Sequence, residues 1–157
     1  MHAFSCVVLH KAWLLLRVSP AHTDGDSYLF FATSNVLHTG DLLFNGVYPV
    51  IDYSTSGWIG GMAAACDVLL KVGDAQTRII PGHGPMCTKT ELKASRDMLA
   101  TVHERLAELA KAGKPVDEVV ASAPTKDLDN QWAKGSLKGD QFTKIAFTSI
   151  LRHAQKS

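Results

Sequence analysis

Short apolar runs separated by polar turns mark the first half of the chain. The runs are rich in aromatic and β-branched residues and lack helical spacing, which favours strands buried in a sheet. Between two of the runs, the side chains of residues 33–35 (Thr-Ser-Asn) can hydrogen-bond their own backbone and predict a turn. The pattern predicts four strands, at about residues 13–18, at residues 27–32, from residue 36 onwards, and at residues 77–80.

Apolar residues at helical spacing predict two longer helices in the second half. Residues 58–72 form one amphipathic pattern, which Ser56 is expected to cap and Gly73 to end. The other helix is expected to begin at a capping box formed by Thr88 and Glu91. The pattern further predicts a short helix at Pro115, a loop over residues 123–139 and a final helix capped by Asp140.

Strands that lead into polar turns, followed by a helical C-terminal third, imply an α/β layered fold. The chain has 157 residues, which is enough for one domain with a hydrophobic core. It contains no internal repeat and no low-complexity tract.

Composition and charge narrow the classes of function. The formal net charge is +1 and there is no basic stripe, so we expect neither a nucleic-acid partner nor a membrane surface. The three cysteines form no C-x-x-C pair, which argues against a disulfide framework or a zinc knuckle. Reduced thiols fit a cytoplasmic protein, and this is the localisation we expect.

The first residues of the chain are apolar, but Lys11 interrupts the run and Arg17 follows it. A secretory signal peptide has its positive charge before the apolar region, so a secreted form is the weaker interpretation. No apolar run approaches the roughly 20 residues that span a bilayer.

Three polar turns near predicted strand ends carry side chains that bind metals. Residues 79–85 (Ile-Ile-Pro-Gly-His-Gly-Pro) present His83 between two glycines, where the absence of a Cβ atom lets the backbone lie close to a neighbour. Residues 19–27 contain His22, and Asp41 follows the short run that begins at residue 36. Any one of these turns alone is weak evidence for a metal site, but three such turns in order are far more specific.

Imidazole and carboxylate groups are the usual protein ligands of zinc and of other first-row divalent metals. A carboxylate between two histidine sites can bridge two metals, which lower the pKa of a shared water and stabilise a developing oxyanion. Such a site hydrolyses its substrate without a serine or cysteine nucleophile. Iron or manganese also suits a mixed histidine and carboxylate site.

The three motifs resemble, in order, those of the metallo-β-lactamase-fold hydrolases. The matching stretches are residues 22–26 (His-Thr-Asp-Gly-Asp), 38–46 (His-Thr-Gly-Asp-Leu-Leu-Phe-Asn-Gly) and 81–85 (Pro-Gly-His-Gly-Pro). The resemblance extends from about residue 18 to the C-terminus. It implies a metal-dependent hydrolase of a small-molecule substrate, with one or two zinc ions, two being the favoured number, and a metal-bound hydroxide as the nucleophile.

The resemblance also implies roles for individual residues. His22 matches the third histidine of the first metal site, Asp41 the bridging, catalytic aspartate, and His83 the last histidine of the second site. His38 lies in the Asp41 motif but is not a ligand in the family pattern. Four further residues are expected to support the ligands or to face the substrate, namely Asp24, Asp26, Tyr48 and Asp52.

The His-x-His-x-Asp-His motif that defines the family does not occur in this sequence. We therefore expect a divergent segment at residues 1–17 and the second half of an αβ/βα sandwich at residues 18–157, with one sheet face and its edge uncovered. A fragment, a misplaced start or an upstream frameshift would each account for this.

Three functional hypotheses follow. The chain is a partial metallohydrolase with weak or no activity alone, or it is active only in an assembly, such as a homo-oligomer, that supplies the missing ligands. Alternatively, it is a non-catalytic binding module that has kept the scaffold.

Overall fold

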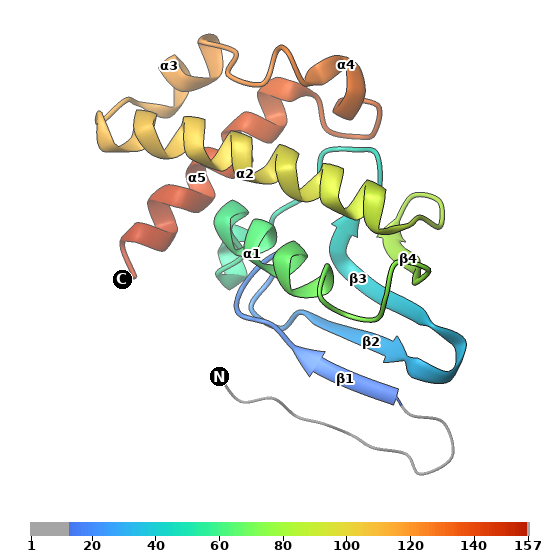
Figure 1. Cartoon of the computed structure of the whole chain (residues 1–157). Helices are drawn as coiled ribbons and strands as arrows, with labels where there is room; N and C mark the ends of the chain where they lie inside the picture. Colours follow the sequence, from blue (N-terminus) through green and yellow to red (C-terminus); the bar gives the residue numbers. More distant parts are fainter. Residues whose placement is uncertain (1–12, 157) are drawn as a thin grey trace.

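A computed structural model describes residues 13–156 of the chain (Figure 1). Its single sheet has four strands in the order β1-β2-β3-β4. The first three strands form an antiparallel meander, and β4 joins β3 in parallel. The strands are β1 (Trp13–Arg17), β2 (Ser27–Phe31), β3 (Val36–Phe44) and β4 (Arg78–His83).

Two helices lie against one face of the sheet, and a helical C-terminal part packs beyond them (Figure 1). Neighbouring strands that run parallel need a long crossover, and α1 lies in the one that connects β3 to β4. This mixed α/β layout confirms the predicted fold class. The helices are α1 (Ile59–Leu69), α2 (Lys89–Lys111), α3 (Val116–Ala121), α4 (Asp129–Trp132) and α5 (Gly139–Ala154), with 3-10 turns at Ala32–Ser34 and Tyr53–Thr55.

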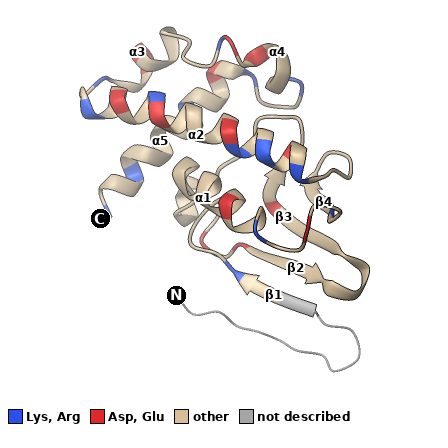
Figure 2. Cartoon of the chain, viewed as in Figure 1, with Lys and Arg blue, Asp and Glu red and all other residues tan. Residues whose placement is uncertain are grey.

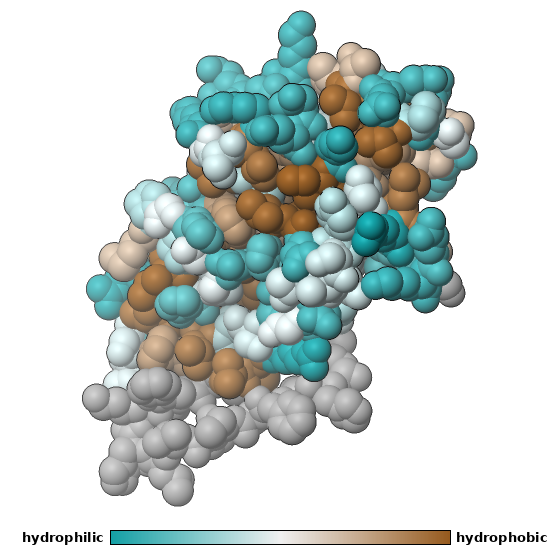
Figure 3. Space-filling model, turned by 180° about the vertical axis from the view of Figure 1, so that it is seen from behind, coloured by the Kyte–Doolittle hydropathy of each residue, from teal (hydrophilic) through white to brown (hydrophobic). Residues whose placement is uncertain are grey.

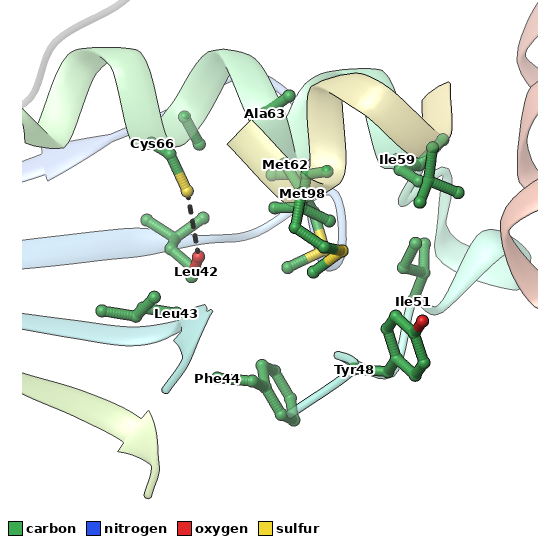
Figure 4. Close-up of a cluster of buried hydrophobic side chains, with 14 of the residues drawn as sticks. Leu42, Leu43, Phe44, Tyr48, Ile51, Ile59, Met62, Ala63, Cys66 and Met98 are labelled. Carbon is green, nitrogen blue, oxygen red and sulfur yellow. Dashed lines mark hydrogen bonds between the residues drawn. The ribbon is translucent and has the colours of Figure 1, made fainter. Parts of the chain in front are cut away.

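The hydrophobic core fills the space between the sheet and the helices. The end of β3 and the segment that follows it point their apolar side chains toward α1 and α2 (Figure 4). The thiol of Cys66 lies 3.9 Å from the carbonyl oxygen of Leu42, and burial raises the pKa of this thiol to about 12. Cys66 is therefore a core residue.

The two faces of the sheet differ in burial. Leu37 and Ile79 pair across β3 and β4 and are completely buried on the side of the helices. The next row of the sheet, which contains Leu29, His38 and Ile80, is only partly buried. Seen from behind, apolar residues reach the molecular surface in several places (Figure 3).

The strand predicted at residues 13–18 exists, but the prediction that it is buried is wrong. β1 lies at the edge of the sheet, Leu15 is 39% exposed, and Arg17 is exposed as well. The division of the chain at residue 17 stays a prediction, although β1 pairs with β2 along its whole length. The signal-peptide hypothesis concerns residues that lie almost entirely outside the described part.

Two predicted helix caps are wrong. Ser56 has a left-handed backbone (φ 74°), and α1 begins after Trp58, whose backbone is extended. Asp140 lies inside the first turn of α5, because Lys138 occupies the capping position. The predicted loop at residues 123–139 also contains the short helix α4.

Charged side chains of both signs gather on α2 and α3, whereas the strands carry few (Figure 2). None of the helices in the described range is long and apolar enough to cross a bilayer.

The capping box of α2 is confirmed. The Thr88 hydroxyl accepts a hydrogen bond from the Thr90 amide at 3.2 Å, and the Glu91 carboxylate accepts one from the Thr88 amide at 2.8 Å. The bonds from Thr88 hold the pKa of Glu91 below its usual value.

We expect Thr88→Ala to lower the free energy of unfolding by about 1 kcal/mol, the usual cost of losing an N-cap. A lowered carboxylate pKa stabilises the fold above the unfolded pKa, and this stability is lost as the pH falls through the folded pKa. The difference between variant and wild type should therefore be full at pH 7 and shrink below about pH 4.5, the ordinary pKa of a glutamate. Urea denaturation at pH 7 and at a pH below 4.5 measures this difference in unfolding free energy, with Thr90→Ala as the neighbouring control.

Candidate metal centre

The parallel pairing of β3 with β4 brings Asp41 beside His83. The register shifts between Gly40 and Phe44, so the ladder is interrupted at Asp41, which lies within β3 rather than in a turn after it. Asp41 Oδ1 lies 3.3 Å from His83 Nε2. Gly82 permits this approach, because a Cβ atom there would lie 2.3 Å from Asp41 Oδ1.

His22 reaches the same carboxylate from the turn between β1 and β2. Its Nε2 atom lies 3.6 Å from Asp41 Oδ2, the second oxygen of the group. Its Nδ1 atom lies 2.8 Å from the carbonyl oxygen of Val50, which can only accept a hydrogen bond. A proton on Nδ1 leaves the lone pair of the neutral ring on Nε2, the atom that faces Asp41.

Backbone contacts and one buried carboxylate hold the His22 turn. Asp26 is 9% exposed and accepts hydrogen bonds from the amide and hydroxyl groups of Thr23 at 2.8 and 3.0 Å. The amide of Asp52 donates to the carbonyl oxygen of His22 at 2.9 Å, and the amide of Trp58 donates to that of Ala21 at 2.8 Å. The segment at residues 52–58 thus fixes the main chain on both sides of the Ala21–His22 peptide bond.

Phe44 forms part of the site, although the sequence analysis did not single it out. Its ring stacks on His83, with centroids 4.3 Å apart and an interplanar angle of 18°, and it lies 5.8 Å from the His22 ring. Phe44 is 8% exposed, so it presents a rigid apolar surface to both imidazoles. In the sequence, only its position at the end of the apolar run after Asp41 indicated that Phe44 lies at the site.

The three residues line an open pocket of about 320 Å³. Gly135 and Ser136, from the loop between α4 and α5, form part of its wall. The C-terminal part of the chain therefore reaches the site. Val47, Tyr48 and Val50 complete the lining together with Phe44.

The four residues expected to support the site, Asp24, Asp26, Tyr48 and Asp52, make different contacts in the structure. Asp26 holds the His22 turn, as described, whereas Asp24 is exposed and contributes its carbonyl oxygen to a hydrogen bond from Arg17. The Asp52 carboxylate accepts a hydrogen bond from the Ser54 amide at 2.9 Å, and its contacts with Ser54 lower the pKa of Asp52. Asp52 thus acts on the site through its backbone amide.

Tyr48 lines the pocket but is 3% exposed. Its hydroxyl donates to Asp129 Oδ1 at 2.8 Å, and its ring stacks on Phe142. Burial and the bond to Asp129 raise the pKa of Tyr48 well above its usual value. These contacts are structural, and they tie the loop after β3 to α4 and α5.

His38 is separate from the three-residue cluster. Its Nδ1 atom accepts a hydrogen bond from the Gly40 amide at 3.1 Å.

The geometry provides two histidine–carboxylate pairs that share Asp41. Each oxygen of the carboxylate faces the Nε2 atom of a different histidine, and this donor set suits a carboxylate that bridges two divalent metals. Within residues 13–156, no group of three or more histidine, cysteine, aspartate or glutamate residues is arranged to hold a single metal ion. The described residues thus contain no complete one-metal site, and His22, Asp41 and His83 present imidazole and carboxylate donors side by side.

Gly57→Ala tests whether the backbone contact at His22 sets the geometry. A Cβ atom at residue 57 would lie 2.1 Å from the His22 carbonyl oxygen. We expect this variant to lose about 1–3 kcal/mol of unfolding free energy in urea denaturation, the usual cost of overpacking. Gly25→Ala, in the turn that carries His22, is the control. A Cβ atom there would have its nearest neighbour 4.0 Å away, so its unfolding free energy should stay within about 0.5 kcal/mol of wild type. Equal stability of the two variants would contradict the assigned role of Gly57.

No protein-family model matches the sequence, and no curated protein matches it either. Solved structures do match the fold. The stereoselective inverting sec-alkylsulfatase Pisa1 from Pseudomonas sp. is 19% identical, with a TM-score of 0.71 over 95% of this chain and 25% of that chain. A metallo-β-lactamase family protein from Thermus thermophilus is 17% identical, with a TM-score of 0.57 over 99% of this chain and 48% of that chain.

A metallo-β-lactamase from Pontibacter korlensis is 13% identical, with a TM-score of 0.54 over 63% of this chain and 46% of that chain. The present chain thus covers less than half the length of each of these three proteins. The likeness confirms the fold that the motifs predicted. The chain therefore has part of the metallo-β-lactamase fold.

Proposed function

We propose that this chain provides part of the metal centre of a metal-dependent hydrolase. The observation that carries the proposal is the position of Asp41, whose two carboxylate oxygens face the Nε2 atoms of His22 and His83 at 3.6 and 3.3 Å. A surface ion pair would need only one such contact. Two contacts from separate elements suit a carboxylate shared between two metal sites.

In this proposal, His22, Asp41 and His83 would hold the divalent metals, with Nε2 of each imidazole and the carboxylate oxygens as donors. Zinc is the metal we propose, although iron or manganese is compatible with the same donors. A pair of bound metals supplies a hydroxide nucleophile near neutral pH and stabilises the oxyanion that develops during hydrolysis.

Other residues of the chain orient these groups. The Val50 carbonyl fixes the proton of His22 on Nδ1, and the Phe44 ring restricts the rotation of His83. The pocket next to the ligands has both apolar and polar lining and an ordinary size for a small-molecule substrate. Gly135 and Ser136 border it, so we propose that the loop between α4 and α5 contacts the substrate.

Three ligands do not complete two metal sites, because a catalytic zinc takes three protein ligands and one water. We therefore propose that the 157-residue chain alone has weak or no hydrolase activity. Complete sites would form in an assembly that supplies further ligands, either with a second copy or with another polypeptide.

Zinc binding by matched variants tests the ligand assignment. Competition with a chromophoric chelator should give zinc binding weaker by about tenfold or more for His22→Ala and for His83→Ala than for wild type. His38→Ala removes a histidine from β3 outside the cluster and should bind zinc as wild type does. No zinc binding by wild type, or equal binding by all variants, would contradict the metal centre and favour the binding-module hypothesis.

The mass of the metal-loaded protein tests the need for an assembly. Light scattering together with elemental analysis should show two metals per chain only in a species larger than the monomer. A monomer that holds two metals per chain and hydrolyses an ester or lactam substrate at enzyme-like rates would contradict the proposed dependence on further ligands.

A further inference from the structure

A second pocket lies between the end of β1, the start of β2 and α1, outside the candidate metal centre. Its volume is about 450 Å³, within the range of small-molecule sites. We propose that this pocket binds a small amphipathic anion, with an apolar chain of medium length and a carboxylate or similar head group. The proposal does not depend on the hydrolase function.

The walls of the pocket are mainly apolar. Leu16 and Val18 come from the β1 end, Tyr28 from β2, and Trp58 from the start of α1. α1 presents only small side chains to much of the cavity, because Gly61, Ala64 and Ala65 all lie on this side. Small residues on the helix leave the space open, and transfer of an apolar chain into it is favourable.

The charge at the pocket has one sign. Arg17 and His153 are among the lining residues, and none of the described lining residues is an aspartate or glutamate. The contact found for the Arg17 guanidinium is the carbonyl oxygen of Asp24, a neutral acceptor. An anionic head group would therefore meet a cation that no carboxylate among the described lining residues neutralises, and a guanidinium binds a carboxylate through two hydrogen bonds.

One aromatic wall is rigid. The His153 ring stacks on the Trp58 indole, with centroids 3.7 Å apart and an interplanar angle of 5°. His103 meets the indole edge-on at 5.4 Å. Two elements far apart in the sequence, the start of α1 and the end of α5, thus form a fixed side of the pocket.

The pocket also borders the turn that carries His22. Pro20 lines the pocket, and the Trp58 amide donates to the carbonyl oxygen of Ala21 at 2.8 Å. Trp58 therefore contacts the pocket with its side chain and the His22 turn with its backbone. A ligand in the pocket would change the surroundings of the Trp58 indole, which gives the binding a spectroscopic readout.

Decanoate is the probe for the test, with decanol as its uncharged counterpart. Isothermal titration below the critical micelle concentration should show one decanoate per chain, with a matching change in tryptophan fluorescence that Trp58→Phe abolishes. Decanol should bind more weakly than decanoate. Absence of decanoate binding to wild type would overturn the proposal.

Two variants, Ala64→Phe and Arg17→Gln, test the apolar cavity and the charge of Arg17 separately. Ala64 is exposed but lines the cavity, so Ala64→Phe should fill the cavity without disturbing the core and weaken decanoate binding by about tenfold or more. Ala75→Phe places the same ring on an exposed turn elsewhere and should bind as wild type does. Decanoate binding that Ala64→Phe leaves unchanged would overturn the assigned location.

Arg17→Gln should weaken decanoate binding about tenfold and leave decanol binding unchanged. Arg78→Gln removes an exposed arginine from β4, outside the pocket, and serves as the matched control. Equal loss in both arginine variants, or no loss in either, would overturn the assignment of Arg17 to the head group. Because neither change touches His22, Asp41 or His83, zinc binding should be the same in both variants.

Discussion

The candidate site depends on two places where the chain approaches itself too closely for any side chain. At Gly57 the backbone lies against the carbonyl oxygen of His22, and at Gly82 it lies against the carboxylate of Asp41. The first approach allows the segment before α1 to hydrogen-bond the His22 turn. The second allows β4 to bring His83 to the same carboxylate. Backbone packing, and not attraction between charges, therefore decides where the two imidazoles meet.

The exposure of the three side chains supports the conclusion that backbone packing, rather than ion pairing, sets the geometry. Asp41 and His83 are 43% and 57% exposed, whereas His22 is 15% exposed. Pairs that are open to water contribute little to stability, about 0–1 kcal/mol. The scaffold thus holds the three side chains in place without needing their mutual contacts. The oxygens of Asp41 are therefore open to contact with a bound cation, as the proposed metal-binding role requires.

The sequence was sufficient for features that depend on neighbouring residues. The capping box at Thr88 and the glycines around His83 are local patterns, and the order of the three motifs was enough to predict the fold. Features that depend on distant contacts were missed. The sequence could not show that Val50 accepts from His22, or that Phe44 stacks on His83.

Tyr48 illustrates the same limit. Its position after the Asp41 motif favoured a role toward substrate, but its hydroxyl bonds Asp129, which is 81 residues away in the sequence. Ser56 is a good capping residue by type, yet a left-handed backbone places it outside the helix. The pocket beside Trp58 was not predicted at all, because β1, α1 and α5 meet there only in the folded chain.

The topology has a consequence for the order of folding. β1, β2 and β3 pair through short connections, whereas β4 joins β3 only after residues 45–77 have crossed over the sheet. Closing a long loop costs more entropy than closing a hairpin, so contacts between distant segments form late. Asp41 belongs to the early meander and His83 to the late strand. We therefore expect the two halves of the carboxylate's environment to form in succession, so that a nascent chain presents His22 and Asp41 before His83 arrives.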